Sequence, residues 1–167
     1  PQDFHDAEGG YLHPYVRVGW QKDKVKLVFP YLPASGYELK TDVTFSMLDL
    51  ETIKWTGSAV KYFTLWDPDW WGTHVLSLRS SGGVVTSYGD DGVPVFDRLW
   101  AGGIGSLRGF RVRGIGPFDF VDREQIGGRG LFLASAQYGM PVAKNYLRLV
   151  AFTDVGWLGS AEGDIIK

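Results

Sequence analysis

The sequence contains no cysteine, no long apolar run and no concentration of charge of one sign. Without cysteine, disulfide bonds and thiolate metal ligands are excluded, although the cellular compartment is left open. No stretch reaches the roughly 18 apolar residues of a transmembrane helix, so none is predicted, while a transmembrane β-barrel remains possible. The formal net charge is −2, with both signs spread along the chain. A nucleic-acid binder would concentrate its basic residues on one surface, so nucleic acid is not an expected partner.

Residue patterns for catalysis and metal binding are also lacking. Residues 103–109 approach the dinucleotide-binding fingerprint, but the glycine spacing is one residue too long and no helix pattern follows. Ser106 lacks the Gly-x-Ser-x-Gly frame of a nucleophile elbow. Residues 90–92 (Asp-Asp-Gly) are interpreted as a turn rather than a calcium loop. Metal-ligand spacing is absent among the three histidines, which are His5, His13 and His74. We therefore expect no enzyme, no catalytic residues, no metal and no cofactor.

Aromatic residues and glycine are abundant. Aromatic side chains make up 15% of the chain and glycine occurs 23 times, whereas charged residues account for only 22%. This mixture favours short strands, glycine-bearing turns and exposed apolar surface over helices. The predicted fold class is all-β.

The clearest strand signal lies at residues 36–47. Tyr37, Leu39 and Val43 fall on one face of this stretch, while Lys40 and Asp42 fall on the other. A period of two residues predicts a strand, and no helix produces it. With Glu38, this polar face carries three charged residues in succession and must therefore meet water. The length suits a strand that crosses a bilayer at a tilt.

The same alternation recurs along the chain. It is strong at residues 132–140 and 147–157, with residues 141–145 between them interpreted as a tight hairpin turn. Weaker alternation marks residues 15–20, 25–31, 53–66 and 73–88. About seven antiparallel strands are predicted, joined mostly by short connections such as residues 32–36 and 67–69.

One connection is long. Residues from about 89 to 130 show no convincing strand or helix pattern and are crowded with glycine. A structureless loop of that length is uncommon in a compact domain and is usually functional or disordered.

Two all-β architectures fit the alternation, a transmembrane β-barrel and a soluble β-sandwich. The predicted inward face carries Lys40, Asp42, Arg79 and Asp154 near strand centres, which a dry sandwich core would not accept without partners. Aromatic residues gather near strand ends, as a girdle at the membrane interface requires. These residues are Trp20, Tyr31, Trp66, Trp70, Trp71 and Trp157. Both features favour an antiparallel transmembrane β-barrel, present here as a partial barrel.

The long loop carries a specific motif. It reads Leu99-Trp100-Ala101-Gly102-Gly103-Ile104-Gly105-Ser106-Leu107-Arg108-Gly109-Phe110 and then Gly114-Ile115-Gly116-Pro117. This stretch resembles the hallmark loop of the BamA family, also called bacterial surface antigens. In that family a Gly-Gly pair precedes a (Val/Leu)-Arg-Gly-(Phe/Tyr) tetrad, and Gly-Pro follows. Three further pieces match in order: residues 31–39, residues 127–141 from Gly127-Gly128 through Gln137 to Pro141, and residues 152–156. The resemblance covers about residues 25–158.

The resemblance implies a larger protein. Members of the family have a sixteen-stranded barrel preceded by soluble POTRA domains. In that frame, residues 1–167 are part of one C-terminal barrel domain and hold roughly the seventh to thirteenth strands. The POTRA domains and the terminal strands are then expected outside this sequence. A chain that opens with Pro1 and has no signal segment suits a piece of a longer precursor.

The resemblance also implies an ion pair. In the family the loop folds back inside the barrel, and the tetrad arginine pairs with carboxylates on the wall. Here the arginine is Arg108, and the matching wall positions are Asp154 and Gln137, where the family usually has glutamate. A guanidinium is well suited to a carboxylate, and with glutamine it keeps a hydrogen bond but loses a charged partner. Without the motif, Arg108 would be interpreted as an exposed loop residue, Asp154 as a turn acid and Gln137 as plain lumen lining.

The function implied by the resemblance is insertion of β-barrel proteins into the bacterial outer membrane, without covalent chemistry. The implied partners are nascent outer-membrane proteins, accessory lipoproteins of an assembly complex and outer-membrane lipid. Two alternatives remain open, because they share the motif or the barrel. One is a two-partner secretion pore or TamA-like translocation pore, and the other is the barrel of an outer-membrane lipase fusion. Sequence upstream of this chain would separate them.

Overall fold

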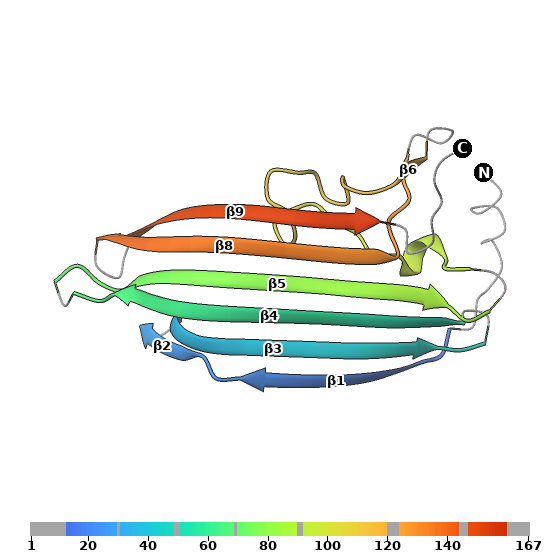
Figure 1. The fold of residues 1–167 in the computed structure, drawn as a ribbon, viewed down its shortest axis with the longest axis horizontal. Helices are drawn as coiled ribbons and strands as arrows, with labels where there is room; N and C mark the ends of the chain where they lie inside the picture. Colours follow the sequence, from blue (N-terminus) through green and yellow to red (C-terminus); the bar gives the residue numbers. More distant parts are fainter. Residues whose placement is uncertain are drawn as a thin grey trace.

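The computed structural model describes residues 13–29, 31–48, 51–68, 70–89, 92–119, 124–143 and 147–159. One open antiparallel sheet of seven strands dominates it, in the order β1-β3-β4-β5-β8-β9, with β2 paired to β3 (Figure 1). Its strands are β1 (Tyr15–Asp23), β2 (Lys26–Phe29), β3 (Leu32–Ser46), β4 (Thr52–Trp66), β5 (His74–Ser87), β8 (Gly130–Ala143) and β9 (Leu147–Gly159). The all-β prediction of about seven antiparallel strands in a partial barrel is confirmed.

The strand register assigns every long strand two faces, because directly paired residues share a side of the sheet. One row joins Glu38, Val60, Arg79, Ser135 and Asp154 across five strands. The next row lies on the opposite face and joins Leu39, Ala59, Ser80, Ala134 and Val155. The predicted charged face and apolar face are therefore separate surfaces of one sheet.

No second sheet covers the apolar face in the part of the chain that the structure describes. The other sheet there pairs only β6 (Phe118–Asp119) with β7 (Glu124–Gln125). The apolar face instead leaves large side chains exposed, among them Trp20, Trp55, Phe132 and Trp157. A soluble β-sandwich would bury such residues between two sheets. The described residues contain no helix with the length and apolar character to span a membrane.

Two predicted connections are in fact strand. Residues 32–36 belong to β3, which begins at Leu32 and pairs there with β2. The alternation was hidden because this pairing is irregular and Gly36 has a φ of 105°, with the Lys24 carbonyl so close that no β-carbon would fit. β8 likewise continues through Pro141 to Ala143 with a register shift, where a proline is tolerated. The remaining hairpin residues, 144–146, lie outside the described residues.

The long connection has more structure than the sequence indicated. It contains the 3₁₀ helix η2 (Val95–Asp97) as well as β6 and β7. Two isolated bridges, Leu99 to Gly128 and Ala101 to Ile115, tie its outgoing and returning arms together. Such one- and two-residue pairings are too short to leave a periodic pattern. Asp90 and Asp91, which were interpreted as a turn, lie outside the described residues.

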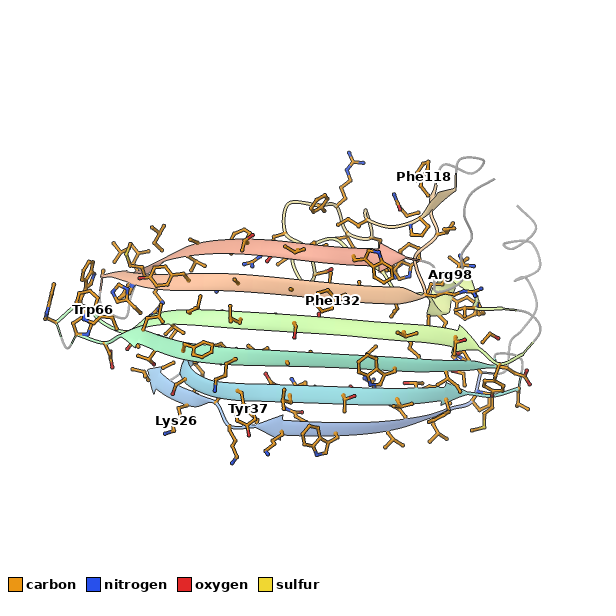
Figure 2. The ribbon with its side chains drawn as sticks, in the orientation of Figure 1. Lys26, Tyr37, Trp66, Arg98, Phe118 and Phe132 are labelled. Carbon is orange, nitrogen blue, oxygen red and sulfur yellow. The ribbon has the colours of Figure 1, made fainter. Side chains whose placement is uncertain are left out.

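The loop sits at one end of the sheet. Figure 2 shows Arg98 beside the ends of β5 and β8, and Trp66 at the far end, where β4 turns into β5. A cluster of buried apolar side chains also lies at the loop end: Val85, Val93 and Leu99, with Leu131 and Leu158 packed against them. Among the described residues, this buried apolar cluster therefore lies between the sheet and the long loop.

Candidate functional site

The tip of the long loop is a tight turn built around glycine. The backbone N–H of Ser106 donates to the Gly103 carbonyl, and that of Gly103 donates to the Leu107 carbonyl. Gly102, Gly103 and Gly109 have φ values of 109°, 96° and 87°. Glycine adopts this left-handed region without strain. Gly105, by contrast, lacks a positive φ, and a β-carbon there would meet no atom within 4 Å.

The turn brings Arg108 against β8 and β9. Its Nε donates to Asp154 Oδ2 at 2.7 Å, and its Nη2 donates to Asp154 Oδ1 at 2.7 Å. The Arg108 backbone N–H also donates to Asp154 Oδ2, at 3.2 Å. The carboxylate thus receives a two-pronged guanidinium and a main-chain donor together. This geometry is among the strongest that proteins use for an ion pair.

Neutral groups accept two further hydrogen bonds from Arg108. Nη1 donates to Gln137 Oε1 at 3.0 Å, and Nη2 also donates to Ser135 Oγ at 2.9 Å. Ser135 in turn donates to Asp154 Oδ1 at 2.6 Å. At Gln137 the contact is a hydrogen bond without a second charge. The structure thus brings together Arg108, Asp154 and Gln137, and adds Ser135.

An aromatic ring completes the contact. The guanidinium carbon of Arg108 lies 3.6 Å from the ring centroid of Phe152. Phe152 precedes Asp154 by two residues on β9 and pairs with Gln137, so it shares their face. Cations are attracted to the negative face of such a ring. Sequence reasoning missed this role, although a phenylalanine two residues before Asp154, on the same face, was a usable signal.

Leu107 provides an apolar contact next to the ion pair. Its side chain is only 4% exposed. It occupies space above Gly156, where a β-carbon would collide with Leu107 and lie 2.8 Å from Leu133 Cδ2. The absence of a side chain at Gly156 thus makes room for the loop on the wall. Phe110, the last member of the tetrad, is 58% exposed and does not join this contact.

The environment of the ion pair is partly shielded from solvent. The side chain of Asp154 is 6% exposed and that of Arg108 is 25% exposed. The hydrogen bond to Asp154 raises the pKa of the Arg108 guanidinium above its ordinary value. Breaking a buried pair by removing one partner typically costs about 3–5 kcal/mol, because the other charge is left without compensation. The loop tip is therefore firmly held.

A cavity of about 390 Å³ lies beside the docked tip. Polar residues of β4, β5 and β8 line part of it, including Tyr62, Ser77, Arg79 and Gln137, and Ile104 enters from the loop. Among the described residues, no group of three or more His, Cys, Asp or Glu side chains has an arrangement that could hold a metal ion. What the geometry provides is attachment of the loop to the wall by hydrogen bonds, charge and packing.

The model of the Omp85 superfamily domain matches residues 13–165. One relative, the outer membrane protein assembly factor BamA of Nitratidesulfovibrio vulgaris, is 39% identical over 84 residues, which cover 50% of this chain and 11% of the relative. The factor of the same name from Neisseria meningitidis serogroup B is 26% identical over 162 residues, covering 88% of this chain and 19% of the relative. This chain therefore spans a fifth or less of these relatives.

A solved structure shares the fold. The crystal structure of BamA from Haemophilus ducreyi lacking POTRA domains 1–3 superposes with a TM-score of 0.75 at 22% sequence identity. The match covers 87% of this chain and 30% of that one. The open sheet is thus similar in fold to part of that BamA structure.

Proposed function

The chain belongs to the Omp85 superfamily, and from this premise we propose that the full-length protein is an outer-membrane protein assembly factor of the BamA type. It is an integral protein of the bacterial outer membrane, as its BamA relatives are. The observation that carries the proposal is the loop tip held on the barrel wall by Arg108 and Asp154. The similarity of the chain to two proteins named outer membrane protein assembly factor BamA also supports the proposal. We further propose that residues 1–167 form part of one barrel domain, continued by strands outside this sequence.

The arrangement of connections gives the barrel an orientation. The long loop leaves from the end opposite the β4–β5 and β8–β9 connections, which are short (Figure 1). In outer-membrane barrels the longer loops are extracellular and the short turns periplasmic. The loop therefore enters the lumen from outside the cell, and Arg108, Asp154 and Gln137 hold it against the inner wall. The apolar face, with Leu39, faces lipid.

Insertion by such a barrel is non-covalent. A barrel seam offers unpaired backbone groups, and an incoming strand can pair with them as in other strand-addition complexes. In this mechanism the docked loop stabilises the barrel wall at β8 and β9. The partners are nascent outer-membrane proteins, accessory lipoproteins of the assembly complex and the surrounding lipid. No catalytic side chain, metal or cofactor takes part.

The test uses the full-length protein reconstituted into lipid vesicles, with an unfolded outer-membrane barrel as substrate. Arg108→Ala leaves Asp154 without its cation and frees the loop tip, so insertion of the substrate should fall. Heat-modifiable migration of the protein itself should persist, because the strand pairing is untouched.

Arg111→Ala is the matched control, since Arg111 is an exposed arginine of the same loop. It should insert substrate at the wild-type rate. Equal insertion by the Arg108 and Arg111 variants would refute the role assigned to the docked loop. A wild-type protein that inserts no barrel, yet exports one cognate polypeptide, would refute the assembly function and indicate a secretion pore.

A further inference from the structure

A second polar contact holds the long loop, at its root rather than its tip. The carboxylate of Asp97, in η2, accepts a hydrogen bond from Thr52 Oγ1 at 2.6 Å. Lys54 Nζ lies 3.1 Å from Asp97 Oδ1 and also donates to the Asp97 carbonyl oxygen at 2.8 Å. Both oxygens of the carboxylate and the main chain of η2 are thus engaged by β4.

This contact uses a different part of the wall from the tip contact. Thr52 and Lys54 are two residues apart on β4, so they point to the same side of the sheet. That side is the loop side, because Lys54 pairs with Val85, a member of the cluster under the loop. Arg108 instead contacts β8 and β9, on the other side of β5.

The contact is largely shielded from water. Thr52 has no exposed surface. The side chains of Lys54 and Asp97 are 25% and 15% exposed, in contrast to an open surface ion pair such as Arg17 with Asp42. Exposed ion pairs contribute little to stability, whereas removing either partner of a shielded pair is strongly destabilising.

Other contacts make the root of the loop a rigid unit. Arg98, next to Asp97, donates from Nε to the Val93 carbonyl and from Nη1 to the Ile126 carbonyl, joining the two arms of the loop. Leu99 then bridges to Gly128 and packs on Val85. Asp97 therefore attaches to β4 a segment whose two arms are joined by hydrogen bonds just before the tip begins.

We propose that Lys54 and Thr52 are positioning residues for the loop, acting through Asp97. They hold the root at β4 so that the glycine-rich stretch beyond it starts from one place and direction. Glycine loses the most conformational freedom on ordering, so a tip with several glycines docks less often if its root is free. Arg108 meets Asp154 because both ends of the outgoing arm are attached to the wall. This inference concerns loop placement and does not depend on the proposed substrate.

Hydrogen–deuterium exchange on the full-length protein in detergent micelles tests the proposal. The readout is the peptide that contains residues 99–110, where the Arg108 amide donates to Asp154. Lys54→Met keeps the length of the side chain without its charge, and Asp97→Asn removes the partner charge. Each should speed exchange at the tip by about fivefold or more. Peptides from β8 and β9 should exchange as in the wild type.

Three further variants sharpen the result. Lys54→Arg keeps the charge and should retain slow exchange. Lys61→Met removes a lysine from the same strand, but one on the opposite face, so it should have no effect. The double variant of Lys54 and Asp97 should match the single variants, because both remove one interaction. If Lys54→Met gives no folded barrel, Asp97→Asn, located on the loop, decides the matter. Tip exchange no faster than in Lys61→Met, or faster exchange confined to residues 92–98, would overturn the proposal.

Discussion

At the scale of single residues, the docked tip combines three interactions that act at neighbouring points. Arg108 forms a two-pronged ion pair with Asp154 and stacks on Phe152. The preceding residue, Leu107, is buried. The ion pair depends on the orientation of the guanidinium relative to the carboxylate, whereas the packing of Leu107 depends on the free volume above Gly156. Because these requirements differ, they can be changed separately.

Gly156→Ala tests the packing requirement without touching any charge. The added methyl group would collide with Leu107 and lie 2.8 Å from Leu133 Cδ2, so both side chains would have to shift. Overfilling a packed contact typically costs about 1–3 kcal/mol. The loop tip should therefore undock more often, and trypsin should cleave after Arg108 faster than in the wild type.

Gly105→Ala is the matched control for this prediction. A β-carbon there meets nothing within 4 Å, and the backbone φ is not positive. Its cleavage rate should equal that of the wild type. Similar cleavage rates for the two alanine variants would show that the space above Gly156 has no part in docking.

At the scale of elements, each long strand separates two environments, and β4 shows this with adjacent residues. Ser58 lies in a row with Lys40 and Ser81 on the loop side of the sheet. Ala59 lies in a row with Leu39 and Ser80 on the opposite, lipid-facing side. The two positions share the same depth, since both are close to the middle of β4 (Thr52–Trp66).

Arginine at these two positions should have very different effects. On the lipid face of a barrel, an arginine near the bilayer midplane costs about 2–4 kcal/mol, whereas the water-filled interior accepts it. Ala59→Arg should therefore lower the denaturant concentration at which the full-length barrel unfolds in lipid vesicles. Ser58→Arg should unfold close to the wild-type concentration. The reverse order would mean that the two faces have been assigned the wrong way round.

At the scale of the whole molecule, the described chain is an open sheet whose buried apolar cluster lies under the loop. β1 and β9 are its edges, and neither has a second partner strand among the described residues. Its apolar face exposes large side chains such as Trp55 and Val155. Open edges and broad apolar surfaces both promote association between copies. The sheet is therefore suited to a membrane and to neighbouring strands rather than to water.

Residues 1–167, produced alone and refolded without detergent, should consequently aggregate. Light scattering and size-exclusion chromatography give the measurement, and refolding in detergent micelles gives the comparison. Detergent should reduce aggregation by covering the lipid-facing surface. A monodisperse monomer with a cooperative thermal transition in plain buffer would contradict the membrane assignment.

The sequence by itself determined most of each long strand and its two faces, but not the short pairings in the long loop. Alternation with a period of two placed Leu39 and Lys40 on opposite sides of β3, as the register has them. This worked because a strand that separates lipid from water must repeat its polarity every second residue. The motif around Arg108 further pointed to Asp154 and Gln137, and the structure places all three in hydrogen-bonding contact.

Only the tertiary structure decided the contacts between distant residues that the motif did not indicate. Alternation predicts the face of a residue but not the register between strands, so the positions of Ser135 and Phe152 around Arg108 were not accessible from it. The contact of Asp97 with Lys54 joins residues 43 positions apart, through a 3₁₀ helix too short to leave a pattern. The path of the loop depends on glycine conformations and on free volume above the wall. These properties arise only when the strands are assembled into a sheet.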